Sequence, residues 1–268
     1  MSGQYLELVL APARSLRRGT IIWSVSMAGL VAMTIAFWPA FKESSALVEM
    51  IDQLPKSMID AFGLADIDTP AGYLRGNLYD FFVPLLLAGA AIGFASGVTA
   101  SEEDSGRMEV VLTQPVARRA VFLGRAVAAL ACLALVTLIM ALAQFASDEI
   151  YGLSIRADRL IATIVLSGLL GLLHGGFALA IAGLRARPSL VLGVGFFVAV
   201  AGCVVVALFP LSEPLRPWAH LSPWDWAFGG EPLLNATEPW RYLALAVPAV
   251  ALALLGAFAF GRRDIRAA

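Results

Sequence analysis

The sequence has little charge and very few of the residues that build metal or disulfide sites. Only 15% of its 268 residues are charged, against about 25% in soluble globular domains, and it contains two cysteines and two histidines. A disulfide framework or a cysteine metal site needs more thiols, so Cys132 and Cys203 are predicted to be small apolar residues within long apolar runs. The near balance of 19 Lys and Arg against 20 Asp and Glu excludes an extended basic surface, and therefore nucleic acid as a partner.

The motifs of nucleotide hydrolysis and of catalysis inside a membrane are missing as well. A P-loop needs a lysine directly after a glycine, and neither of the two lysines, Lys42 and Lys56, follows one. The two histidines, His174 and His220, are too far apart for an H-E-x-x-H pair, and no nucleophile beside a base is visible. We therefore expect a chain that is not an enzyme and that holds no metal or cofactor of its own.

The sequence is instead rich in long apolar stretches. Hydrophobic residues make up 59% of the chain, and six stretches reach the roughly 20 apolar residues that a helix needs to cross a hydrocarbon core. Each must be helical because lipid offers the backbone no hydrogen-bond partner, and continuous apolar runs exclude a β-barrel. The predicted fold is all-α, a single polytopic membrane domain of residues 1–268 with six transmembrane helices. These helices are expected at about 20–38, 81–100, 121–146, 160–184, 190–211 and 242–260.

The basic residues indicate how these helices are oriented. Six spans place both termini on one side, and 12 of the 19 basic residues fall on that side, in short segments. The other 7 are spread over much longer loops. Because basic residues accumulate on the cytoplasmic side, we predict a multi-pass protein of the cell membrane with both termini in the cytoplasm.

The N-terminal segment, residues 1–19, mixes leucines with arginines. This composition suits an amphipathic segment in the inner membrane interface, broken or kinked at Pro12. The alternative is an unstructured basic tail.

Two outer loops also carry a pattern. Loop 39–80 contains an apolar stripe at helical spacing, formed by Leu47, Ile51, Leu54, Met58 and Phe62. Loop 212–241 is rich in tryptophan, which predicts an aromatic belt at the lipid headgroups, with gating of a substrate as the alternative.

The connection between the second and third stretches, residues 101–120, is the most densely charged part of the chain. Acidic residues lead it, Asp104 or Ser105 would cap a short helix, and a pair of arginines closes it. Acidic residues contribute little to membrane topology, so this segment is predicted to be a docking surface that offers charge and an apolar face to the cytoplasm. The alternative is a solvated loop. The apolar face would consist of Met108, Val111 and Leu112.

This segment resembles the cytoplasmic coupling loop of ABC transporter permeases of the type 2 exporter class. The likeness rests on an acidic pair followed by Gly106, Leu112, Pro115 and paired arginines, and it extends to the plan of six spans with a long first outer loop. It implies that the loop inserts into a cleft of a separate ATP-binding subunit, which binds the ATP and Mg²⁺. The residues that it assigns to coupling are Glu102, Glu103, Asp104, Gly106, Arg107, Glu109, Leu112, Pro115, Arg118 and Arg119.

The same resemblance implies a permease subunit of an ATP-driven exporter, similar to those of antibiotic and multidrug efflux. Its substrate would be a hydrophobic or amphiphilic compound such as a drug, an antibiotic or a lipid-like molecule. The chain has half the length of relatives with fused permease halves, which implies pairing with a second copy or a close paralogue. Two alternatives stay open: a non-transporting membrane anchor or assembly subunit, and a secondary carrier.

Within the spans, small residues and one histidine stand out. Glycines spaced at four allow close helix packing and are predicted to serve it, with a dimer seam or a substrate wall as the alternative. His174 is the only ionisable side chain near the centre of a span, so it either handles a proton or substrate in the transport path or is a neutral side chain that hydrogen-bonds a facing helix. The glycines are Gly89, Gly93, Gly97, Gly171 and Gly175.

Overall fold

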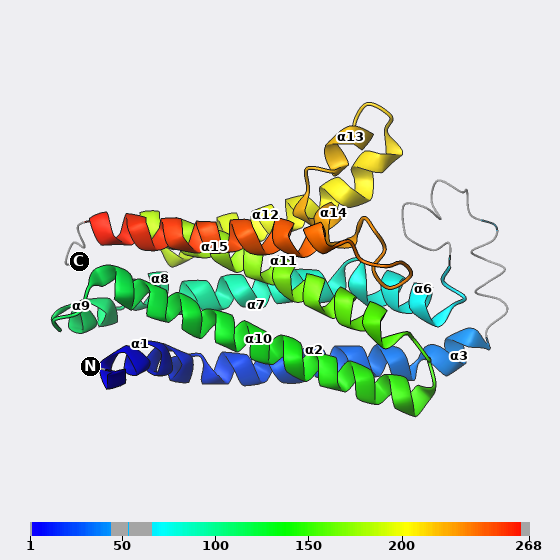
Figure 1. Cartoon of the computed structure of the whole chain (residues 1–268), viewed down its shortest axis with the longest axis horizontal. Coiled ribbons are helices and arrows are strands. Elements are labelled where there is room, and N and C mark those ends of the chain that lie inside the picture. Colours follow the sequence, from blue (N-terminus) through cyan, green and yellow to red (C-terminus); the bar gives the residue numbers. More distant parts are fainter. Residues whose placement is uncertain (1, 44–52, 54–65, 264–268) are drawn as a thin grey trace.

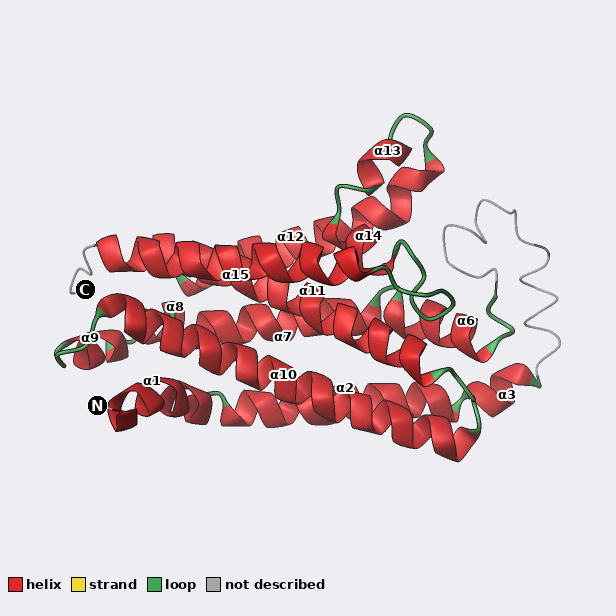
Figure 2. Cartoon of the chain, viewed as in Figure 1, coloured by secondary structure: helices red, strands yellow, loops and turns green. Residues whose placement is uncertain are grey.

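A computed structural model describes residues 2–43, 53 and 66–263, and every element in this part of the chain is a helix or a connection between helices (Figure 2). Six helices are long and apolar enough to cross a membrane, which confirms the predicted all-α, six-span fold. The apolar stripe predicted in loop 39–80 lies outside the described residues. The six spans are built on α2 (Arg17–Ala36), α7 (Phe82–Val98), α10 (Arg118–Tyr151), α11 (Ala157–Leu184), α12 (Pro188–Leu208) and α15 (Pro239–Arg262). The first, second and fifth spans continue into short helices and comprise Arg17–Lys42, Pro70–Asp104 and Pro188–Leu211.

Short helices flank the long ones. They are α1 (Ser2–Ser15), α3 (Trp38–Lys42), α6 (Pro70–Leu74), the π-helix η1 (Arg75–Tyr79), α8 (Ala100–Asp104), α9 (Arg107–Leu112), the 3₁₀ turn η2 (Phe209–Leu211), α13 (Arg216–Ala219) and α14 (Pro223–Phe228).

The beginning of α1 and the end of α15 lie at one end of the bundle together with α8 and α9 (Figure 1). We call this the terminus end. The opposite end carries α3, α6, α13 and α14, and we call it the loop end. The helix α10 has 34 residues and is about 51 Å long, against a hydrocarbon core of about 30 Å, so it extends well beyond the core.

Two helices, α7 and α11, form the centre of the bundle. Their most apolar windows are 67% buried, against 33% or less for the other four spans. α11 packs against both α7 and α15, α12 packs on α7, and α2 packs along α10. The remaining apolar faces of the outer helices are open, as expected for surfaces that meet lipid or another chain.

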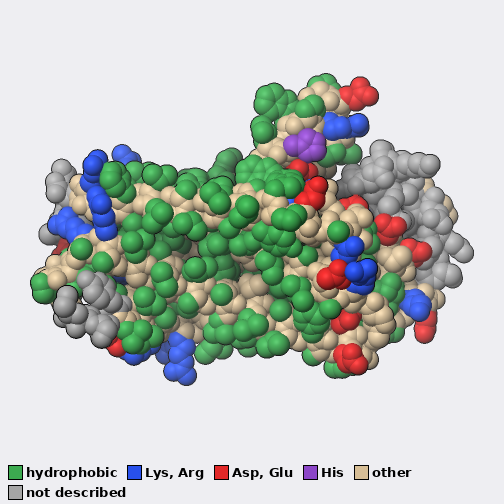
Figure 3. Space-filling model, viewed as in Figure 1, with side chains coloured by type: hydrophobic (Ala, Val, Ile, Leu, Met, Phe, Trp, Pro, Cys, Tyr) green, Lys and Arg blue, Asp and Glu red, His purple; other side chains and the backbone are tan. Residues whose placement is uncertain are grey.

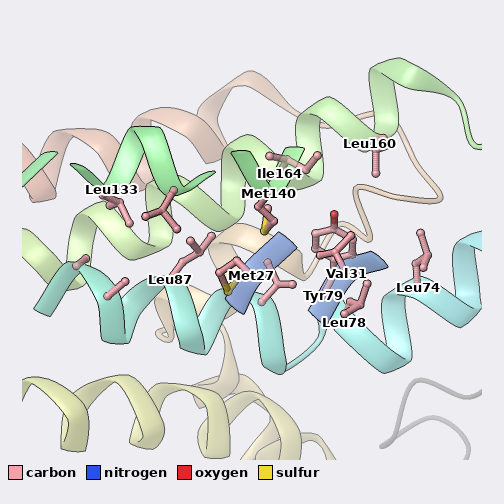
Figure 4. Close-up of a cluster of buried hydrophobic side chains, with 14 of the residues drawn as sticks. Met27, Val31, Leu74, Leu78, Tyr79, Leu87, Leu133, Met140, Leu160 and Ile164 are labelled. Atoms are coloured by element: carbon pink, nitrogen blue, oxygen red, sulfur yellow. The ribbon is translucent and has the colours of Figure 1, made fainter. Parts of the chain in front are cut away.

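The largest buried cluster among the described residues runs along the bundle between α2, α7, α10 and α11, and Figure 4 shows part of it. Met27 and Val31 of α2 meet Met140 of α10 there, and the Tyr79 hydroxyl donates to Gln144 Oε1 (3.2 Å). The bond pairs two polar groups that lipid would leave unsatisfied.

The N-terminal helix α1 continues through Pro12 to Ser15, so the predicted break does not occur. Proline has no N–H, and the carbonyl that loses its helical partner is that of Leu8. This carbonyl lies against Gly124 of α10, where a Cβ would be only 2.7 Å from the Leu8 oxygen. α1 therefore packs along the beginning of α10.

At the loop end, the last loop is tied to the bundle by polar contacts. Arg75 of η1 is buried and donates to Glu231 (2.7 Å). Trp224 is also buried, packed on Gly202 of α12, and does not belong to the predicted aromatic belt. Trp218 and Trp240 are exposed, as a belt requires.

The contact between α11 and α15 depends on glycines that let the two backbones touch. A Cβ on Gly176 would overlap the carbonyl of Ala249, and one on Gly183 would overlap the carbonyl of Gly256. Close approach of this kind is the usual packing device of membrane helices.

We expect Gly183→Ala to lower the free energy of unfolding by about 1–3 kcal/mol, because the new methyl group must push α15 away. The matched control is Gly193→Ala on α12, where no described atom lies within 4 Å of the new Cβ. The control should be neutral or slightly stabilising, since alanine favours a helix over glycine. Denaturation by SDS in mixed micelles, followed by tryptophan fluorescence, measures both; equal effects would contradict the packing role of Gly183.

Candidate functional site

The charged connection 101–120 folds into two short helices at the terminus end. α8 and α9 are joined at Gly106, whose φ of +73° is a left-handed conformation that glycine adopts at little cost. The predicted side-chain cap is absent: α9 begins after Gly106, and the Ser105 hydroxyl donates back to the carbonyl of Glu102 (3.2 Å). A turn made by glycine therefore takes the place of a cap made by Asp104 or Ser105.

Glu102 anchors this connection to the third span. Its carboxylate forms an ion pair with Arg125 of α10, and only 8% of Glu102 and 3% of Arg125 is exposed. The same guanidinium donates to the carbonyl of Val98 (2.7 Å) at the end of α7. The last carbonyls of a helix have no hydrogen-bond partner within it. Arg125 therefore gives the Val98 carbonyl a donor and the buried carboxylate of Glu102 a counter-charge.

Glu103 anchors the connection to the last span. It forms an ion pair with Arg263, the residue that follows α15. Arg118, at the start of α10, donates to the backbone carbonyl of Arg263 (3.0 Å). The two neighbouring glutamates thus bind two different spans: Glu102 the first part of α10, and Glu103 the residue that follows α15.

We call seven of the exposed residues between positions 104 and 115 the tip. Val110 is its apolar member, with 69% of its surface exposed. The tip consists of Asp104, Arg107, Glu109, Val110, Thr113, Gln114 and Pro115.

The apolar face of α9 points into the bundle, which differs from the prediction that it faces the cytoplasm. Met108 is fully buried among Val121 and Phe122 of α10, and Val111 and Leu112 are partly buried against the same cluster. Burial is favourable because these side chains leave water. The face is therefore part of the core, and Leu112 supports the tip from behind.

Of the residues assigned to coupling, the structure divides the charged ones into three groups. Glu102 and Glu103 are paired within the chain, while Asp104, Arg107 and Glu109 are exposed at the tip. Arg118 and Arg119 form the third group, at the end of α15: Arg118 donates to the carbonyl of Arg263, and Arg119 stacks on Phe258.

Sequence reasoning missed the two partners, Arg125 and Arg263, as site residues and counted them only as basic residues of one side. The signal for Arg125 was available, because it lies inside the predicted span 121–146, where an ionisable side chain is expected to be buried and paired. Nothing in the sequence marks Arg263 as the partner of Glu103.

The five glycines predicted to serve packing have different neighbours in the structure. Cβ atoms on Gly171 and Gly175 would lie 3.1 Å from Leu87 and Ala91 of α7, respectively. On α7, a Cβ at Gly89 would meet Phe196 and one at Gly97 would meet Leu16, while one at Gly93 would have no described atom within 4 Å. Spacing alone does not reveal that these three glycines have different surroundings.

His174 is buried and bonded within its own helix. Its Nδ1 lies 2.8 Å from the carbonyl oxygen of Leu170, and since a carbonyl only accepts, Nδ1 carries a proton. The acceptor belongs to the same helix, α11, and not to a facing helix as the alternative predicted.

Metal ligands do not gather anywhere in residues 2–43, 53 and 66–263: no group of three or more His, Cys, Asp or Glu is placed to hold an ion there. Cys132 and Cys203 are both buried and free.

Comparison with known proteins covers the whole bundle, not only the charged connection. A family model described as "ABC-2 family transporter protein" matches residues 13–265. None of the curated proteins matches the chain.

Proposed function

The chain belongs to the ABC-2 family of transporter proteins, and on this premise we propose that it is the permease subunit of an ATP-driven exporter. Its ATP-binding subunit is a separate chain, which holds the nucleotide and Mg²⁺. The observation that carries the proposal is the arrangement of residues 101–120, where an exposed tip stands on two glutamates that are ion-paired to α10 and α15.

In this proposal the tip docks on the ATP-binding subunit, at the cytoplasmic face of the cell membrane. The position of α1 and of the end of α15 beside α8 and α9 supports this orientation, together with the excess of arginine there (Figure 1). The partner drives transport only if its two nucleotide states contact the tip differently, because a ligand without differential affinity shifts no equilibrium.

Motion of the tip would reach the spans through the paired glutamates. Glu102 is linked to α10 and to the end of α7 by way of Arg125, and Glu103 is linked to the end of α15. A buried ion pair resists separation, because each charge left alone in an apolar surrounding is costly. The tip and these helix ends would therefore move together.

The substrate path would lie between two permease copies, identical or closely related. The open apolar faces of the outer spans and the absence of charge at the centre of the described spans favour a hydrophobic or amphiphilic compound, such as a drug, an antibiotic or a lipid-like molecule.

Transport in proteoliposomes tests this function. The chain alone should hydrolyse no ATP, and the chain with its co-purified ATP-binding subunit should move fluorescent amphiphiles only when ATP is present and vanadate is absent. Uptake by the chain alone, driven by an ion gradient, would instead establish a secondary carrier. Stable assembly with an ATP-binding subunit without any ATP-dependent movement of amphiphiles would favour an anchor or assembly role.

A further inference from the structure

An apolar groove opens on the face of the bundle between α10 and α15. It has a volume of about 170 Å³ and lies between Leu123 and Val127 of α10 and Val250 and Leu254 of α15. Its floor is made of small residues, including Gly175 of α11. Charged side chains lie toward the two ends of this face, and hydrophobic ones cover its middle (Figure 3).

A second apolar groove, of about 380 Å³, continues the first between α10 and α11. Leu130, Leu133 and Leu172 line both grooves. Along α10 the lining runs from Leu123 to Phe145, which is about 33 Å at 1.5 Å per residue. The combined groove is therefore as long as the hydrocarbon core is thick, about 30 Å.

Two arginines stand at the terminus end of this groove. The guanidinium carbons of Arg119 and Arg262 lie 4.9 Å and 4.1 Å from the centre of the Phe258 ring. Arg119 is one helical turn from Leu123, and Phe258 is one turn from Leu254, so the charges sit directly beyond the mouth of the groove.

These two charges have no carboxylate partner within the described residues, which end at 263. Both guanidinium carbons lie within 5 Å of one ring centre, so the two like charges are at most about 9 Å apart, and an anion bound to both would relieve their repulsion. A guanidinium matches the oxygens of a phosphate in a bidentate manner.

We propose that this groove and Arg119 and Arg262 form a binding site for an anionic phospholipid. Its phosphate binds the two guanidinium groups, and an acyl chain lies in the groove between α10 and α15. Basic groups beside an apolar crevice at the cytoplasmic side of a membrane protein suit such a lipid. The site does not depend on the coupling proposed for the tip.

Charge favours this occupant over a second copy of the chain. A twofold pairing centred near these arginines would set the same positive charges of both copies against each other. A zwitterionic lipid would fill the groove equally well but would gain less from two arginines.

Native mass spectrometry of the purified full-length protein with added phosphatidylglycerol or phosphatidylcholine tests the site. The wild type should retain phosphatidylglycerol preferentially, and Arg119→Ala/Arg262→Ala should bind it about tenfold more weakly, with little change for phosphatidylcholine. The matched control is Arg17→Ala/Arg18→Ala, which removes two exposed arginines near the terminus end but away from the groove. Its preference should stay that of the wild type.

Two further variants distinguish binding of the lipid headgroup from binding of its acyl chain, and they show whether a loss of binding is due to misfolding. Phe258→Leu keeps both charges but releases them from the ring, and should reduce the preference for phosphatidylglycerol. Ala126→Phe fills the groove and should weaken both lipids alike. Equal losses in the two double-arginine variants, unchanged binding after Ala126→Phe, or a Val127→Cys disulfide between two copies would each overturn the proposal.

Discussion

Replacing Arg125 with methionine is expected to destabilise the protein by about 3–5 kcal/mol, because the change leaves the buried carboxylate of Glu102 without its counter-charge. It also removes the donor to the Val98 carbonyl. Methionine keeps most of the side-chain volume, so the loss reports charge and hydrogen bonding more than packing. Unfolding by SDS in mixed micelles measures the difference in free energy.

A double-mutant cycle isolates the pair. Glu102→Gln/Arg125→Met should be more stable than Arg125→Met, because no charge is then left alone in the interior. The matched control is Arg107→Met at the exposed tip, which should change stability by no more than about 0.5 kcal/mol. A loss below about 1 kcal/mol for Arg125→Met would show that the pair is not the buried anchor described above.

The spans could be predicted from the sequence because their cause is local. Apolar length over about 20 residues fixes a transmembrane helix whatever its neighbours are. All six predicted helices are present, and α10 runs beyond its predicted stretch of 121–146 at both ends.

The ion pairs of the candidate site join residues that are far apart in the sequence, and they could not be predicted from it. Glu103 and Arg263 are 160 positions apart, so no spacing rule connects them. The acidic residues were predicted to face a partner, whereas two of the four, Glu102 and Glu103, are held within the chain. Only the tip keeps the exposure that the sequence interpretation gave to the whole segment.

The sequence also could not show in which direction an apolar helix face points. Helical spacing correctly places Met108, Val111 and Leu112 together, but it does not say whether their face points to solvent or to the core. The same holds for Trp224, whose burial depends on the space that Gly202 leaves on another helix. Both facts follow from tertiary packing.

Reversing two charges at the tip is expected to uncouple the ATP-binding subunit without unfolding the permease. Asp104→Arg/Glu109→Arg replaces two acidic side chains of the tip by basic ones. A partner surface that is complementary to the acidic tip would then face like charges, which cost several kcal/mol at an interface. Both side chains are exposed and have no ion-pair partner in the described part of the chain, so stability should be unchanged. Stimulation of the partner's ATPase activity should fall tenfold or more.

The most direct test of coupling through the tip is the ATPase rate of the co-purified complex, reconstituted in proteoliposomes, for this variant and for Glu7→Arg. Glu7 is exposed near the same end, on α1, and its reversal controls for added positive charge. We expect at least a tenfold loss of stimulation for Asp104→Arg/Glu109→Arg and a change of less than about twofold for Glu7→Arg. Full stimulation in the tip variant would contradict the claim that this surface receives the ATP-binding subunit.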